Sequence, residues 1–126
     1  MAQTFAFKLI PKPTFIAAVQ LTVPGQPEPA EVDFTFIHKG RLELALWRSQ
    51  VQAPADPEKL KTWVAPKDVD FLAEVITDWG RVDDPEGKPV PYSKNALEEL
   101  LDNYPAAAGE IYGGYLRAQT ESRAKN

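Results

Sequence analysis

The chain has 126 residues, a length that suits one domain with a modest apolar core. Its 14 lysine and arginine residues are outnumbered by 18 aspartate and glutamate residues, and the formal net charge is -4 at pH 7. Such a chain has no basic excess with which to follow a phosphate backbone, so nucleic acid is not an expected partner. The absence of cysteine excludes disulfides, thiol nucleophiles and thiolate metal sites.

The chain carries no recognisable targeting or membrane-spanning segment. Residues 1–8 lack the basic start and the long apolar run of a signal peptide. No apolar stretch approaches the roughly 20 residues that cross a bilayer. We therefore expect residues 1–126 to form a single domain that works inside the cell and does not enter a membrane.

The first third of the chain predicts a β-hairpin. Residues 14–23 and 30–38 alternate apolar and polar side chains and are rich in β-branched and aromatic types. The connector, residues 24–29, reads Pro-Gly-Gln-Pro-Glu-Pro and cannot continue a strand. Because a lone hairpin is marginal in water, the rest of the chain must cover its apolar face.

Two short helices are predicted next. Residues 40–51 fit either a strand or a helix, and their leucine, glutamate, alanine and arginine content favours a helix. Asp56 followed by Pro57 is typical of a helix cap with proline at the first helical position, and this helix is expected to reach about Val64.

Three further helices are predicted in the second half. The first opens at Pro66, carries an apolar stripe that ends at Trp79, and stops at Gly80. After a loop over residues 83–92, Ser93 caps the second, which ends at Tyr104. The last starts after Pro105 and runs to residue 116, and residues 117–126 are expected to fray. The predicted fold is α+β, an N-terminal β-hairpin followed by a bundle of about four short helices.

Residues with catalytic potential are few. His38 is the only histidine, so a catalytic triad or a multi-histidine metal site has little to draw on. The acidic residues 78, 83, 84 and 86 do not match a calcium loop, because counting back from Gly87 places Val82 at the first ligand position. A solvated loop is favoured, although the pattern leaves general acid/base carboxylates open. We expect no enzyme activity, no cofactor and no metal.

The candidate partner-binding residues are apolar and aromatic. Tryptophan is common at interface hot spots, and Trp47 reads about equally well as core and as anchor. The stripe on the last predicted helix has the same double interpretation, since it either seals the domain or presents a face to a partner. The predicted partner-binding residues are Trp47, Ile111, Tyr112, Tyr115 and Leu116.

A succession of short segments resembles a known protein family. The segments are Phe7-Lys8-Leu9, residues 13–15, 19–25 and 32–39, Ile76-Thr77-Asp78-Trp79-Gly80-Arg81-Val82, residues 87–93, and Tyr104-Pro105. Over residues 7 to 116, their order and spacing resemble the tail assembly chaperones of long-tailed bacteriophages.

The resemblance implies a function in a phage or prophage. Such chaperones bind the tape measure protein, keep it soluble, help recruit tail tube protein subunits in the cytoplasm of the bacterial host, and are absent from the mature virion. A homo-oligomer is compatible with coating a long partner. The alternative from the same setting is a small structural tail or head-tail connector protein retained in the virion. A small enzyme built on the acidic loop and a host adaptor are further alternatives.

Overall fold

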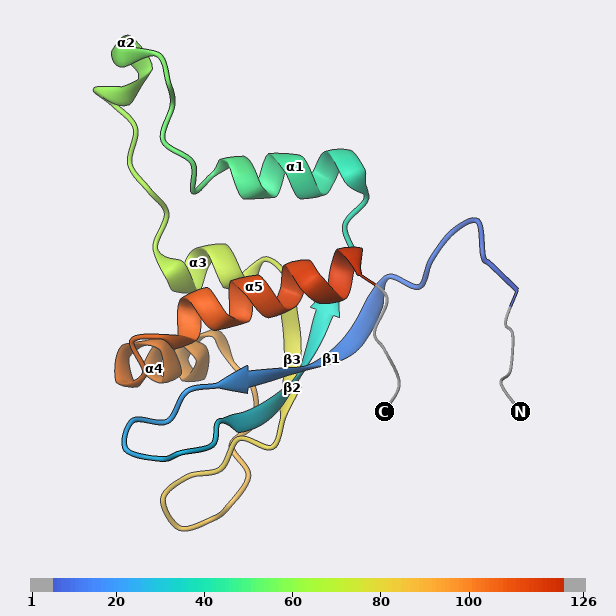
Figure 1. Ribbon diagram of the computed structural model, residues 1–126, viewed down its shortest axis with the longest axis vertical. Coiled ribbons are helices and arrows are strands. Elements are labelled where there is room, and N and C mark those ends of the chain that lie inside the picture. The colour runs from blue at the N-terminus through green and yellow to red at the C-terminus, as the bar shows by residue number, and fades with distance from the viewer. Residues whose placement is uncertain (1–5, 122–126) are drawn as a thin grey trace.

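The computed structural model describes residues 6–121. In chain order the elements are β1 (Thr14–Leu21), β2 (Ala30–Ile37), α1 (Arg41–Ser49), α2 (Pro57–Leu60), α3 (Asp68–Ala73), β3 (Ile76–Gly80), α4 (Lys94–Asn103) and α5 (Ala107–Thr120). Within residues 6–121, the strands form one antiparallel sheet in the order β1-β2-β3, with five helices around it (Figure 1). The predicted α+β class and the N-terminal hairpin are confirmed.

The two strands of the predicted hairpin pair antiparallel along their whole length. Thr14 lies opposite Ile37 at one end and Leu21 opposite Ala30 at the other. The connector turns at Gly25, whose φ of 84° lies in the left-handed region that glycine adopts without strain. Alternate side chains of both strands therefore enter the core, and the others face the opposite side of the sheet.

The third strand replaces the second half of a predicted helix, and that prediction was wrong. Helix α3 ends at Ala73, and residues 76–80 pair with β2 instead. A β-bulge between Thr35 and Phe36 interrupts the regular pairing, so Ile76 and Trp79, three residues apart, both enter the core. That spacing imitates a helical stripe, and Gly80 is the last residue of a strand instead of a helix stop.

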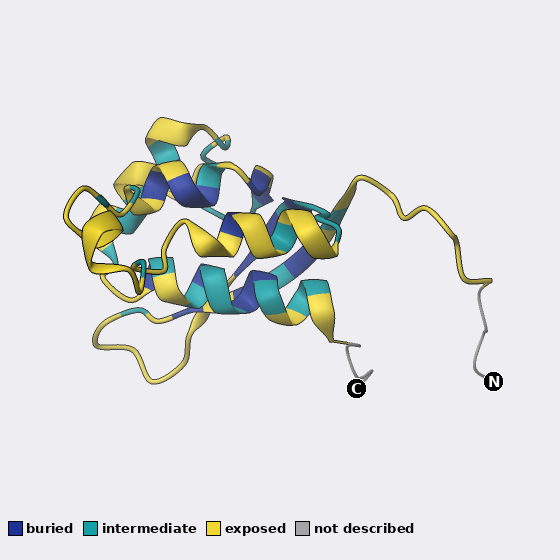
Figure 2. Ribbon diagram, turned by 90° about the horizontal axis from the view of Figure 1, so that it is seen from above, coloured by how far each residue is buried: buried dark blue, intermediate teal, exposed yellow. Residues whose placement is uncertain are grey.

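In the part of the chain that the structure describes, the helices cover one face of the sheet and leave the other open. Helix α5 packs on β1, and α4 and α3 lie beside it, so the core forms between these helices and the sheet (Figures 1 and 2). The largest fully buried side chains are Trp47, Tyr115, Phe34, Phe36, Leu72, Leu97, Ile111 and Val75. On the opposite face of the sheet, Ile16 remains 72% exposed.

Helices α1 and α2 form an excursion away from this body (Figure 1). The Gly40 N–H donates to Glu43 Oε1 at 3.2 Å and starts α1 where a helix was predicted. The Glu58 N–H donates to Asp56 Oδ1 at 3.0 Å, as expected for the cap. Helix α2 nevertheless has only four residues and ends at Leu60, short of Val64, because none of its side chains is buried.

Helix α5 runs to Thr120 and does not stop at Leu116. Its last turn is fastened to the chain between β2 and α1. The Gln119 Nε2 donates to the Lys39 carbonyl oxygen at 2.8 Å and lies 3.1 Å from His38 Nδ1. A tertiary contact, which the polar sequence of this segment does not predict, therefore orders residues 117–120. Residues 122–126 of the predicted frayed tail lie outside the described residues.

Candidate partner-binding surface

The acidic loop has a structural role in the turn that it forms. Asp84 Oδ1 accepts hydrogen bonds from the Glu86 and Lys88 N–H groups, both at 2.9 Å. Gly87 follows with a φ of 83°, and the loop closes through a bridge between Asp83 and Pro89. Among residues 6–121, no three histidine, cysteine or acidic side chains lie close enough to hold a metal ion. Over the same residues, no helix has the length and apolar character to cross a membrane.

Trp47 anchors α1 to the body of the domain. Its indole N–H donates to the Phe71 carbonyl oxygen at 3.0 Å. The Trp47 and Phe71 rings stack with centroids 4.1 Å apart and an angle of 1° between their planes. Only 2% of Trp47 is exposed, and it is the only buried residue of α1. In this conformation the predicted anchor faces the core and cannot touch a partner.

Two members of the predicted stripe on α5 are also in the core. Ile111 and Tyr115 are both 0% exposed. The Tyr115 hydroxyl donates to the Ile37 carbonyl oxygen at 2.8 Å, which ties α5 to the end of β2. Burial, followed by the nearby charge of Glu43, raises the pKa of Tyr115 to about 12. These two side chains hold the fold and present nothing to a partner.

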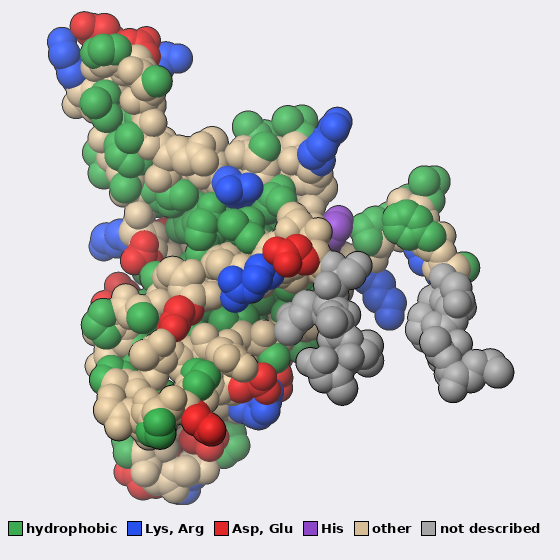
Figure 3. Space-filling model, viewed as in Figure 1, with side chains coloured by type: hydrophobic (Ala, Val, Ile, Leu, Met, Phe, Trp, Pro, Cys, Tyr) green, Lys and Arg blue, Asp and Glu red, His purple; other side chains and the backbone are tan. Residues whose placement is uncertain are grey.

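The other two members of the stripe reach the surface. Tyr112 and Leu116 are half-buried where α5 faces α1. The Tyr112 ring lies with its centroid 5.6 Å from that of Trp47, and its hydroxyl accepts a hydrogen bond from Arg48 Nε at 3.3 Å. Figure 3 shows apolar side chains gathered between α1 and α5 on this face of the molecule. Of the five predicted residues, the structure leaves Tyr112 and Leu116 available for contact.

An exposed set of apolar side chains lies on the α1–α2 excursion and was not predicted as a site. We call it the α1–α2 apolar surface, made of Leu42, Leu46, Val51, Leu60 and Val64. Leu42 is 72% exposed, Leu46 62% and Val64 83%. Apolar side chains show on α1 and along the connection to α2 in Figure 3. The signal was present in the sequence, because Leu42 and Leu46 are one helical turn apart and cannot share a face with Trp47.

A second exposed apolar segment precedes β1. Residues 6–13, the N-terminal arm, leave the sheet and project from the body (Figures 1 and 2). Phe7 is 97% exposed, Leu9 96% and Ile10 81%. The His38 N–H donates to the Pro13 carbonyl oxygen at 2.9 Å, so the arm leaves in line with β1.

An apolar cleft of about 630 Å³ lies between the sheet, α4 and the loop after β3. We call it the end-of-sheet cleft. Its apolar lining comprises Leu21, Val32, Trp79, Val82, Val90 and Leu100, among others, and its acidic residues are Asp83, Asp84 and Glu99. The Trp79 indole N–H donates to the Val90 carbonyl oxygen at 2.8 Å, which holds the loop in place.

Arg81 fixes the other side of that loop. It has a φ of 68°, an uncommon conformation outside glycine. Its guanidinium donates to both carboxylate oxygens of Asp33, at 2.9 and 2.8 Å, and to Glu31 at 2.6 Å. The hydrogen bonds to Asp33 and then Glu31 raise the pKa of Arg81. Because both partners are on β2, this cluster stabilises the turn that leads from β3 into the cleft loop.

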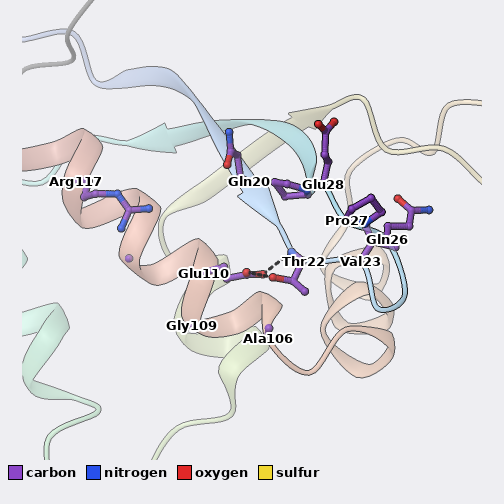
Figure 4. Close-up of a pocket in the computed structure, with 12 residues that line it drawn as sticks. Gln20, Thr22, Val23, Gln26, Pro27, Glu28, Ala106, Gly109, Glu110 and Arg117 are labelled. Carbon is purple, nitrogen blue, oxygen red and sulfur yellow. Dashed lines mark hydrogen bonds between the residues drawn. The ribbon is translucent and has the colours of Figure 1, made fainter.

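A second hollow, of about 730 Å³, separates the hairpin connector from α5 (Figure 4). Figure 4 shows the Thr22 and Glu110 side chains pointing toward each other and joined by hydrogen bonds. The Thr22 N–H donates to Glu110 Oε1 at 2.9 Å, and the Thr22 hydroxyl donates to Oε2. These two hydrogen bonds fasten the chain just after β1 to α5.

Comparison with known proteins identifies the family. A model of the phage tail assembly chaperone matches residues 1–126, the whole chain. No curated protein and no solved structure matches. Because the match spans every element described above, the chain belongs to the phage tail assembly chaperone family.

Proposed function

We propose that this chain binds the tape measure protein of its phage or prophage, keeps it soluble in the host cytoplasm and helps recruit tail tube subunits. It then leaves before the tail is complete. The observation that carries the proposal is the α1–α2 apolar surface on a member of this chaperone family. The chain would act by binding, without a catalysed reaction.

The α1–α2 apolar surface suits an amphipathic helix. A long helical partner that is not yet enclosed by a tube exposes apolar stripes, and these need a complementary apolar surface. Leu42 and Leu46 are one helical turn apart on α1, with 72% and 62% of their surface exposed. Burying what remains exposed of both would contribute about 2–4 kcal/mol.

Tyr112 and Leu116 extend the proposed surface from α1 onto α5. Both pack against the core and still reach solvent. The tyrosine supplies a ring and a hydroxyl, a combination that is enriched at interfaces. Trp47 would contribute indirectly, by holding α1 at the position where its outer face is presented.

The test is co-expression with the tape measure protein of the same phage or prophage, followed by affinity purification and a solubility assay. The wild-type chain should co-purify with the tape measure protein and keep it in the soluble fraction. The double variant Leu42→Ser/Leu46→Ser should weaken binding by at least roughly 10-fold, since it removes more than about 1.4 kcal/mol of apolar contact.

The matched control is Ile16→Ser. Ile16 is 72% exposed, the same fraction as Leu42, but it lies on the open face of the sheet. This variant should bind like the wild type. Equal weakening by both variants would show that the α1–α2 apolar surface is not the binding site. An insoluble tape measure protein with or without the chain would refute the chaperone function.

A structural protein of the virion is the alternative function. It predicts that the chain is found in purified mature particles at a fixed ratio to the tail proteins. A chaperone that leaves during assembly predicts its absence. Mass spectrometry of purified particles, with the tail tube protein as internal standard, separates the two.

A further inference from the structure

From the N-terminal arm and the end-of-sheet cleft, we propose that copies of this chain associate head to tail. The arm of one copy, residues 6–13, would occupy the end-of-sheet cleft of the next. This inference does not rest on binding of the tape measure protein.

The arm has the chemistry of a segment that is buried by a partner. Phe7, Leu9 and Ile10 are between 81% and 97% exposed, and a run of large apolar side chains is costly to leave in water. Lys8 and Lys12 punctuate the run. Pro11 and Pro13 keep this part of the backbone extended, so little conformational freedom is lost when the arm docks.

The cleft has the complementary chemistry. Its apolar lining includes Leu21, Trp79 and Leu100, and its volume of about 630 Å³ can accept more than one large side chain. Asp83 and Glu99 add exposed negative charge to its lining. Arg81, the one cation that residues 6–121 contribute to the lining, is paired with two carboxylates of β2. The cleft is therefore apolar with a net acidic rim, and the arm is apolar with two basic residues.

The geometry favours the arm of another copy over the chain's own arm. Leu21, which lines the cleft, lies at the far end of β1 from Pro13, about 26 Å away at roughly 3.3 Å per residue. The hydrogen bond from His38 to the Pro13 carbonyl oxygen directs the arm away from that end. If the arm folded back along β1, Phe7 would lie at most about 20–22 Å from Pro13. Phe7 would therefore stop short of Leu21 in the cleft of its own chain.

Association of this kind is heterologous. Each copy offers an arm at one end of β1 and a cleft toward the other, so binding one copy leaves a free arm and a free cleft. A row of copies can therefore grow along a long partner. The α1–α2 apolar surface shares no residue with the arm or the cleft, so docking of the arm does not use it.

Sedimentation velocity over a range of concentrations tests the proposal on the full chain. The wild type should show a weight-average mass that rises with concentration. The arm variant Phe7→Ser/Leu9→Ser/Ile10→Ser should remain monomeric, with an unchanged melting temperature because these residues do not contribute to the core. A wild type that is monomeric throughout, or an arm variant that associates like the wild type, would overturn the proposal.

Reversed charges make the test specific to the cleft. The cleft variant Asp83→Lys/Glu99→Lys should lose self-association, whereas Glu98→Lys, on the same helix but outside the cleft, should retain it. Combining the cleft variant with Lys8→Glu/Lys12→Glu in one chain should restore it. Failure of this rescue in a folded chain would refute the assigned pairing.

Mixing the variants identifies the occupant of the cleft. The arm variant keeps an intact cleft and the cleft variant keeps an intact arm, so an equimolar mixture should form a dimer that grows no further. If the mixture stays monomeric, the arm does not bind the cleft of a second copy. Loss of self-association with normal tape measure binding would separate this proposal from the function proposed above.

Discussion

Replacing Gly114 with alanine tests how closely α5 packs on β1. A Cβ at residue 114 would lie 2.8 and 3.0 Å from the two methyl carbons of Val19. Val19 is 2% exposed and branched at Cβ, so it cannot turn aside without disturbing its neighbours. The adjacent Gly113 is the matched control, because a Cβ there meets only the tip of the flexible Arg117 side chain, at 3.4 Å.

The two substitutions should change stability in opposite directions. Each gains about 1 kcal/mol from the higher helix propensity of alanine. At residue 114 the forced contact costs about 1–3 kcal/mol, as overpacking of a core does. Gly113→Ala should therefore raise the free energy of unfolding by about 1 kcal/mol, and Gly114→Ala should lower it by up to about 2 kcal/mol.

Urea unfolding followed by tryptophan fluorescence measures both free energies. A double-mutant cycle with Val19→Ala identifies the clash, because removing the two methyl groups should make Gly114→Ala neutral or stabilising in that background. If Gly113→Ala and Gly114→Ala stabilise the protein equally, α5 does not approach β1 as described and the packing argument fails.

Three further predictions concern single side chains. Trp47→Ala should release α1, lowering its local stability by about 3–5 kcal/mol; hydrogen exchange should then accelerate in α1 before the sheet, and equal acceleration in both would contradict the anchoring role. The pKa of Tyr115 is raised to about 12 from 10.0, so the folded state holds this proton more tightly than the unfolded state. The neutral phenol contributes fully to the free energy of unfolding below about pH 10. This contribution is lost as the pH rises to about 12, and the loss is at most about 2–3 kcal/mol. Tyr115→Phe should remove that part of the alkaline destabilisation in unfolding curves measured against pH, and an unchanged profile would show that burial of the phenol is not its cause. Ser93→Ala should cost about 1 kcal/mol in urea unfolding, since it removes the oxygen that accepts the Ala96 N–H at 3.0 Å; no loss would mean that this cap is not formed in solution.

Most of the local structure followed from local sequence signals. Alternation and a proline-rich connector predicted the hairpin, and both strands pair as expected. Asp56 and Ser93 each accept a backbone N–H at the start of the helix that they were predicted to cap. These features involve residues within a few positions of one another, so the interactions that stabilise them can be predicted from the local sequence.

The candidate site was predictable only in part. The stripe on α5 was identified correctly as an apolar face, but the sequence did not separate its inner members from its outer ones. Ile111 and Tyr115 are fully buried, whereas Tyr112 and Leu116 are only partly buried. Which members of the stripe are buried depends on where α5 crosses the sheet. The sequence of α5 alone does not specify that position. Whether Tyr112 and Leu116 bind a partner stays a prediction.

The sequence by itself determined the hairpin, the helix caps and an α+β order of elements. The tertiary structure decided the identity of residues 76–80 and the direction in which Trp47 points. A short apolar segment satisfies either a strand or a helix, and here the free edge of β2 supplied the backbone partners. Phe71 supplied the ring and the carbonyl oxygen that draw Trp47 inward. Both outcomes depend on contacts between groups that are distant in sequence, and these contacts stabilise the chain only once it has folded.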